Sequence, residues 1–256
     1  MSTPAPGTIE EEWGVPIPGV ILPPERWTQT ALKRMPAEGR LDWSSLFGRV
    51  APVVLDLGCG NGRFLLGSAL SRPDHDHLGI DTLPVVIRYA RRRGNQRGLT
   101  NLKFAVGGAT ELLRDYVPPG SVAEIHCYHP QPYVDPKSAH RRLISPAFLA
   151  LVHRSLKPGG LFVIQTDHPD YWNYMRRVVP IFFDFRIQPG PWPDAPEGRT
   201  RREILARQRG LKVYRGYGWS RVDLNVDEAI SAAERQPMPF FRRDRRHRDI
   251  DRLERE

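Results

Sequence analysis

A glycine-rich segment with a carboxylate on either side is the part of the sequence best suited to holding a ligand. The run DLGCGNG begins at Asp56, follows an apolar stretch and contains Gly58, Gly60 and Gly62. Side chains at these glycines would block close approach of a ligand to the backbone, and the next segment can offer helix N-terminal N–H groups. Asp81 ends the following apolar run, where a carboxylate can accept both hydroxyl protons of a ribose.

A proline-rich segment after a later apolar run is the second candidate, with the sequence YHPQPY. Pro130 and Pro132 fix φ and bias the residues before them away from helix, which predicts a stiff, extended shelf. Tyr128 and Tyr133 are candidates to stack on an unpaired base, although both can also be packing residues.

Basic residues follow this shelf in the run DPKSAHRR. Lys137, Arg141 and Arg142 are candidates for phosphate contact because they adjoin the proposed pocket. The arginines at 91–93 and 97 are interpreted as a solvated face, and the run at 242–248 as a mobile cationic tail or an exposed helix. Two histidines of this region, His129 and His140, are interpreted as loop or surface residues.

Alternating strands and helices must position these segments. Apolar runs predict strands at 53–57, 77–81, 102–106, 122–128 and 161–167, with two late strands at 181–187 and 211–219. Helical spacing predicts helices at 62–72, 83–98, 145–160 and 171–179, and Ser145 is expected to cap the third. We therefore predict an α/β fold with a doubly wound, mostly parallel sheet, in which ligands bind beyond the carboxyl ends of the strands.

Composition limits the class of protein. The chain has 256 residues and a formal net charge of +9, which favours a polyanionic partner. Cys59 and Cys127 lack metal-type spacing and are expected to be core residues in a reducing cytosol. We expect no secretory signal, no membrane span and no metal site. The predicted organisation is an extended or partly disordered arm (1–44), one main domain (45–222) and an Arg-rich tail (223–256).

The glycine loop and its two acids together resemble the class I S-adenosylmethionine (SAM) methyltransferases, whose sheet has seven strands. A nucleotide-binding or dehydrogenase fold is the alternative. The dinucleotide fingerprint places its third glycine one residue later than Gly62, which disfavours it.

Several longer segments, in order, resemble the bacterial tRNA (guanine-N7)-methyltransferase family over roughly residues 45–222. The most specific are the HRRLISPAFL run, the TDHPDY segment and the T-x-x-E pattern of TRRE. The resemblance implies SAM-dependent methylation of N7 of a guanosine in the tRNA variable loop, by a cytoplasmic monomer or homodimer.

The resemblance also implies roles for single residues. Cofactor contacts would come from the glycine loop and from the acids and loops at neighbouring strand ends: Asp56, Gly58, Gly60, Gly62, Asp81, Gly108 and Ala109. Substrate contacts would come from the basic run and two later segments: Asp135, Lys137, Arg141, Arg142, Asp167, Thr200, Arg201, Arg202 and Glu203.

The sequence departs from the family pattern F-P-D-P-W in the proposed pocket. Gln131 stands at the position of the family aspartate, Tyr133 at that of the tryptophan, and Asp135 at that of a lysine. Gly108 occupies the position of the usual acid after the third strand. We assign Gln131 to the catalytic centre and expect weakened transfer, since an amide keeps an acceptor but loses the charge. A methyltransferase for another RNA or a small molecule, and a catalytically inactive RNA-binding protein, remain alternatives.

Overall fold

A computed structural model describes residues 5–242 and 244–254. Residues 1–4 of the predicted arm and residues 243, 255 and 256 of the predicted tail lie outside this range. The chain divides into two compact units. The first contains the chain up to Pro118 together with Arg199–Arg201, and the second contains Pro119–Gly198 and the chain from Arg202 onward.

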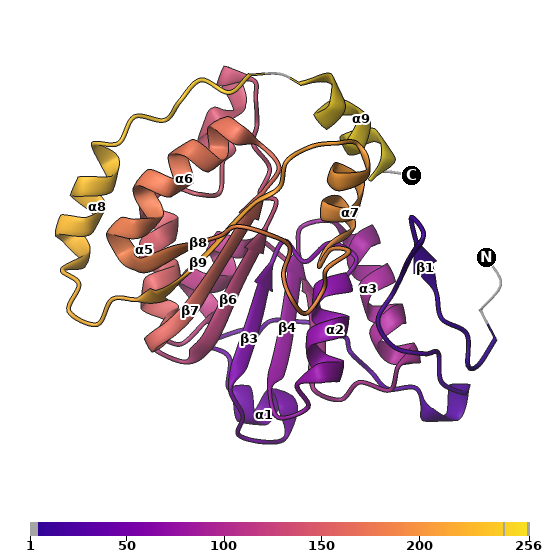
Figure 1. The fold of residues 1–256 in the computed structure, drawn as a ribbon. Coiled ribbons are helices and arrows are strands. Elements are labelled where there is room, and N and C mark those ends of the chain that lie inside the picture. The colour runs from indigo at the N-terminus through magenta and orange to yellow at the C-terminus, as the bar shows by residue number, and fades with distance from the viewer. Residues whose placement is uncertain (1–4, 243, 255–256) are drawn as a thin grey trace. The chain divides into compact units, whose positions relative to one another are not determined.

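The first unit contains three parallel strands in the order β5-β4-β3. All five residues of β3 are buried, as expected for a parallel strand that is covered on both faces. Helices α2 and α3 contact each other and the strands (Figure 1). The elements are β1 (Glu11–Glu12), β2 (Val15–Pro16), η1 (Pro24–Arg26), α1 (Trp43–Phe47), β3 (Val53–Leu57), α2 (Arg63–Ser71), β4 (Asp76–Asp81), α3 (Pro84–Gln96), β5 (Leu102–Val106), α4 (Ala109–Glu111) and η2 (Leu112–Tyr116).

The described part of the N-terminal arm packs onto this unit. Ile17 and Ile21 are each only 1% exposed. Farther along, the arm lies beside the edge strand β5: Phe104 donates its N–H to the carbonyl of Thr30 (2.7 Å), and Leu32 donates to the carbonyl of Phe104 (2.9 Å). The arm therefore satisfies backbone groups that an edge strand would otherwise expose.

Arginines of α3 and its C-terminal end hold the arm through ion pairs with Glu10 and Glu12. Arg97 lies 3.1 Å from a Glu10 carboxylate oxygen, and Arg92 lies 3.6 Å from the other. Arg93 pairs with both glutamates at 3.8 and 3.6 Å. The interpretation of this basic run as a solvated face is wrong for Arg93 and Arg97, whose side chains are only 12% and 1% exposed, whereas the side chain of Arg92 stays 37% exposed.

The second unit contains four strands in the order β6-β7-β9-β8. Strand β6 is parallel to β7, whereas β9 is antiparallel to both β7 and β8. Helices α5, α6 and α8 pack against one another (Figure 1). The elements are β6 (Val122–Tyr128), η3 (Pro136–Arg141), α5 (Pro146–Ser155), β7 (Leu156–Thr166), α6 (Pro169–Phe182), β8 (Phe183–Gln188), α7 (Arg201–Gln208), β9 (Tyr214–Ser220), α8 (Val226–Glu234) and α9 (Arg245–Leu253). The seven strands of the two units confirm the predicted α/β class with a mostly parallel sheet.

The predicted helix over 145–160 is correct at its start and wrong at its end. The Ser145 hydroxyl accepts the N–H of Phe148 at 3.2 Å, as expected for an N-cap. However, α5 ends at Ser155, because Leu156 adopts an extended conformation and pairs with Val122 of β6. Strand β7 therefore begins five residues before the predicted strand at 161.

The run at 242–248 leads into helix α9, and its described arginines are exposed, as the exposed-helix interpretation expects, but His247 and Ile250 of this helix are buried. Helix α9 buries Ile250 completely, against a cluster that includes Leu205 and Leu211. The guanidinium of Arg202 also lies 2.7 Å from carboxylate oxygens of both Asp251 and Glu254. An apolar contact and two ion pairs therefore hold this helix to α7.

The buried arm predicts different effects for two identical substitutions. Ile21→Ala should destabilise the protein by about 2–4 kcal/mol, because it leaves a cavity beneath the arm. Ile9→Ala is the matched control, since Ile9 is 54% exposed, and it should leave stability nearly unchanged. Equilibrium denaturation in urea measures both. An equally small effect of the two substitutions would contradict the packed arm.

Candidate functional site

The glycine loop after β3 combines three glycines in the left-handed region. Gly58, Gly60 and Gly62 have φ values of 81°, 52° and 78°. A Cβ placed on Gly58 or Gly60 would meet no atom within 4 Å, whereas one on Gly62 would lie 2.7 Å from the ring of Phe104. The first two glycines therefore border open space, and the third permits close packing of the loop on β5.

The two carboxylates beside this loop have different surroundings. Asp81 accepts the N–H of Gly60 at 3.1 Å and that of Leu83 at 2.9 Å. Asp56 is 1% exposed, and its Oδ1 has no hydrogen-bond partner among the described residues. Burial, reinforced by repulsion from Asp81, raises the pKa of Asp56 well above its usual range. Burial also raises the pKa of Asp81, and its backbone hydrogen bonds oppose this.

These features fit SAM, the cofactor that the resemblance implies. A buried carboxylate oxygen without a partner is suited to a cationic group, and SAM carries an ammonium and a sulfonium. The space beside Gly58 and Gly60 allows a ligand to approach the backbone. Asp56 and Asp81 would hold the cofactor's cationic and hydroxyl groups.

The loop after β5 differs from the family pattern because it has a glycine in place of an acid. Gly108 is the N-cap residue of α4, and both Gly108 and Ala109 are partly exposed. A Cβ on Gly108 would lie 3.8 Å from Glu111 Oε2, so a side chain would fit there. Glu111 supplies a carboxylate beside this position. Sequence reasoning missed it because the family pattern directs attention to residue 108.

The proline-rich segment after β6 has strained backbone at both ends. His129 and Tyr133 have φ values of 50° and 41°, in a region that costs a residue other than glycine about 1–3 kcal/mol. Pro130 is buried and Gln131 is exposed. The predicted shelf is therefore bent at its two ends and presents Gln131 to solvent. Tyr128 is buried at 6% exposure, which favours its interpretation as a packing residue.

The two arginines after this segment lie in different environments. Arg142 is 8% exposed and donates to the carbonyls of Pro132 (2.8 Å) and Tyr133 (3.0 Å), with its guanidinium 3.6 Å from the centre of the Phe241 ring. Arg141 is exposed, with its guanidinium 4.7 Å from the centre of the Tyr133 ring. Arg142 thus holds the loop, and Arg141 is the one available to a ligand.

The remaining residues of the basic run lie in η3. Asp135 is exposed and accepts the N–H of Lys137 at 3.0 Å, which caps this short helix. The Lys137 side chain is exposed. Asp135 therefore has a structural function in addition to its predicted contact with substrate.

Asp167 and Glu203 are buried and already bound by arginines. Asp167 is 4% exposed and lies 3.1 Å from Arg202 and 3.0 Å from Nδ1 of His129. Burial alone would raise the pKa of Asp167, but these two partners outweigh burial and hold it well below its usual range. Glu203 is fully buried and paired with Arg215. Their contact with a substrate stays a prediction, and their observed contacts are with the protein.

The other two residues of the T-x-x-E segment belong to the first unit. Thr200 and Arg201 are both partly exposed. Arg201 lies 3.9 Å from Glu12 of the arm, and its guanidinium lies 5.6 Å from the centre of the Trp13 ring. The segment that resembles the family is thus divided between the two units, with Arg202 and Glu203 in the second.

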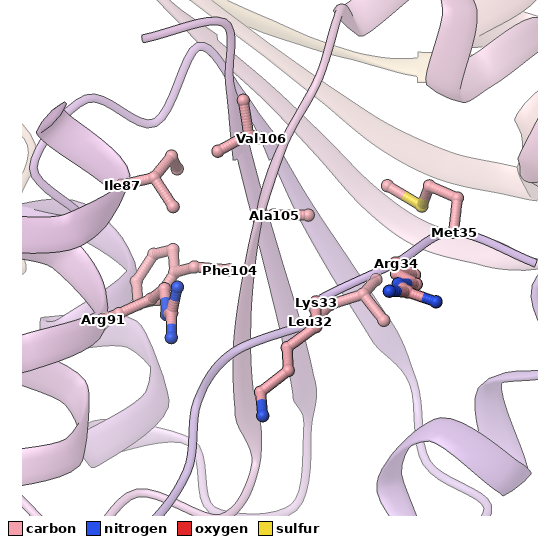
Figure 2. Close-up of a pocket in the computed structure, with 9 residues that line it drawn as sticks. All are labelled: Leu32, Lys33, Arg34, Met35, Ile87, Arg91, Phe104, Ala105 and Val106. Atoms are coloured by element: carbon pink, nitrogen blue, oxygen red, sulfur yellow. The ribbon is translucent and has the colours of Figure 1, made fainter. Parts of the chain in front are cut away.

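A surface pocket in the first unit lies between the arm, α3 and β5 (Figure 2). Apolar side chains and three cationic ones line it: Leu32, Met35, Ile87, Phe104, Ala105 and Val106, with Lys33, Arg34 and Arg91. None of the predicted site residues lies in it. Sequence reasoning missed this pocket because it depends on the long-range contact between the arm and the edge strand.

The raised pKa of Asp56 predicts that a neutral replacement stabilises the free protein. The folded carboxyl binds its proton more tightly than the unfolded one, so ionisation of Asp56 costs stability as pH rises above 3.8. Asp56→Asn should therefore raise the melting temperature at pH 7, and the gain should shrink as pH falls toward 3.8. SAM affinity, measured by calorimetry, should fall.

A matched substitution provides the control. Hydrogen bonds from Ser45 and Ser44 lower the pKa of Asp42 to about 2, so Asp42→Asn should reduce the melting temperature at pH 7. An Asp56→Asn protein less stable than wild type at pH 7, with unchanged SAM affinity, would contradict the assignment.

Comparisons with known proteins identify the family. The family model described as "Putative methyltransferase" matches residues 50–215. A tRNA (guanine-N(7)-)-methyltransferase of Alcanivorax borkumensis is 34% identical over 190 residues, which cover 74% of this chain and 79% of that protein. A protein of the same name from Halorhodospira halophila is 33% identical over 186 residues, 73% of this chain and 80% of that one.

Among solved structures, the 16S rRNA methyltransferase KamB has a similar fold. It is 18% identical, with a TM-score of 0.52, and the match covers 72% of this chain and 95% of that chain. At this identity the likeness concerns the fold alone. The long matches to named relatives go further, and they show that this chain belongs to the tRNA (guanine-N7)-methyltransferase family.

Proposed function

We propose that this protein transfers a methyl group from SAM to N7 of a guanosine in the variable loop of tRNA. The observation that carries the proposal is the 34% identity to a tRNA (guanine-N(7)-)-methyltransferase across 79% of that protein's length. The buried carboxylate of Asp56 beside an open glycine loop supports the choice of cofactor. When bound, SAM supplies an electrophilic methyl group on a sulfonium.

The chemistry places modest demands on the protein. Guanine N7 carries an in-plane lone pair in the neutral base, so no proton must leave before it attacks a methyl group. A general base contributes only where a proton is transferred in the transition state. The protein's main task is to orient the reactants, which can lower a barrier by about 7–11 kcal/mol. Gln131 can serve this task as an exposed hydrogen-bonding group, without the charge of an aspartate.

The partner and compartment follow from this proposal. A net charge of +9 supports binding to tRNA, and we place the protein in the cytoplasm as a monomer or homodimer. No helix among the described residues is long and apolar enough to cross a membrane. Within residues 5–242 and 244–254, no group of three or more His, Cys, Asp or Glu side chains is placed to hold a metal ion.

Gln131 favours one competing function. An RNA-binding protein that has lost catalysis would also keep the basic residues and tolerate an amide at this position. A methyltransferase acting on another RNA is a further alternative. The two experiments that follow separate these possibilities from the proposed function.

Methyl transfer from labelled SAM should mark unmodified tRNA but not the same tRNA with 7-deazaguanosine at the target position, because that base has no N7 lone pair. Asp56→Ala should abolish labelling through loss of SAM binding, and Gln131→Asp should increase the rate. Labelling of the 7-deaza tRNA would indicate a different target atom. No labelling by wild type, together with activity in Gln131→Asp, would indicate the RNA-binding alternative.

Substitutions of the neighbouring residues Arg141 and Arg142 should have different effects, one on tRNA binding and the other on the stability of the loop. Arg141→Ala should weaken tRNA binding by up to about tenfold at 0.1 M salt and reduce the salt slope by about 1, since one phosphate contact is lost. Arg142→Ala should mainly lower the melting temperature, because it leaves two partly buried carbonyl acceptors without their donor. Filter binding across a salt series and thermal melts measure both. Equal effects of the two substitutions on tRNA binding would contradict this distinction.

A further inference from the structure

The side chain of His129 is buried, although the sequence predicted a loop or surface residue at this position. Its side chain is only 3% exposed, and its backbone N–H donates to the carbonyl of Gln165 at 2.7 Å. The imidazole Nδ1 lies 3.0 Å from Oδ1 of Asp167, and Nε2 lies 2.8 Å from Nε2 of Gln165. One residue therefore ties the start of the loop to the end of β7 at three points.

The surrounding hydrogen bonds determine which imidazole nitrogen carries the proton. The indole N–H of Trp192 can only donate, and it lies 2.7 Å from Oε1 of Gln165. The amide nitrogen of Gln165 consequently donates to Glu203 (3.1 Å) and to Nε2 of His129. His129 accepts at Nε2 and donates from Nδ1 to the carboxylate of Asp167.

The opposite end of the same loop is also fixed from inside the protein. Arg142 donates to the carbonyls of Pro132 and Tyr133, and its guanidinium packs on Phe241. Between the two fixed ends, Gln131 is exposed. Buried partners thus hold the loop at both ends and leave Gln131 facing solvent.

We propose that His129 is a positioning residue, which locks the loop so that Gln131 is presented to the substrate in one orientation. This inference rests on the proposed methyl transfer. A displacement of an orienting group by about 1 Å can reduce the rate about 100-fold. Loss of the hydrogen bonds that fix this strained loop should therefore have a measurable effect on turnover.

Glycine is the sharpest replacement, because it tolerates the positive φ of residue 129 and removes both imidazole hydrogen bonds. His129→Gly should lower kcat about 10- to 100-fold, with the SAM dissociation constant and the KM for tRNA changed less than about threefold. His129→Asn should recover part of the rate, since asparagine accepts a positive φ and keeps a polar side chain. His153→Asn is the control: its imidazole makes one hydrogen bond, to the carbonyl of Arg221.

The outcomes separate this inference from the proposed function. An active wild type with an equally active His129→Gly protein overturns the positioning role and leaves the proposed function standing. The positioning role is also overturned if His129→Gly loses no more kcat than His153→Asn does, or if its loss of kcat is matched by a loss of SAM affinity. A folded wild type that binds SAM but does not methylate tRNA overturns both.

Nitrogen NMR of the wild-type imidazoles gives a second test that needs no activity. The resonance that disappears in His129→Gly should show a protonated Nδ1 and an unprotonated Nε2 at pH 7, without exchange between tautomers. A proton on Nε2, or rapid tautomer exchange, would overturn the proposed lock. If His129→Gly does not accumulate as a folded protein, His129→Asn can be used instead to assign the imidazole resonances of His129.

Discussion

The arrangement of the second unit depends on the hydrogen bonds and ion pair that the buried carboxylate of Asp167 makes with His129 and Arg202. Arg202 and His129 share this carboxylate, and Arg202 also reaches the acids of α9, so one guanidinium connects β7, α7 and the C-terminal helix. Removing one partner of a buried ion pair costs about 3–5 kcal/mol, because the other charge stays in the interior. The loop that carries Gln131 is attached to this group through His129, so its position is fixed by the same interaction.

The two buried aspartates, Asp56 and Asp167, differ in whether the protein itself supplies partners for the carboxylate. Asp167 has cationic and hydrogen-bonding partners within the protein, which lower the pKa of its carboxyl group despite burial. Asp56 has an oxygen without such a partner, and the pKa of its carboxyl group is raised. A carboxylate that costs stability in the free protein is suited to a cationic ligand, because the ligand supplies the missing partner. Asp56 thus has the features of a binding group, and Asp167 those of an internal support.

Local sequence patterns predicted the elements that carry the cofactor loop, because continuous apolar runs, glycines and caps act over a few residues. The buried β3, the N-cap at Ser145 and the loop at Gly58 are examples. The burial of Ile21 in the arm and of Ile250 in the tail was not predicted, since it depends on partners far away in sequence, such as Leu205 for Ile250. The resemblance predicted Asp167 and Glu203 as substrate contacts, which stays a prediction, and it carries no information on their burial or on the arginines that bind them. The buried environment of His129 was missed for the same reason.

Methylation of N7 of guanosine in tRNA is the activity on which the roles given to Asp56, Gln131 and His129 depend. The most direct measurement is to produce the protein in a bacterial strain that lacks its own tRNA guanine-N7 methyltransferase, and to map 7-methylguanosine in the tRNA by mass spectrometry. Wild-type protein should restore the modification in the variable loop, and Asp56→Ala should not. If tRNA from cells containing folded, SAM-binding wild-type protein stays without 7-methylguanosine, this chain does not have the proposed activity.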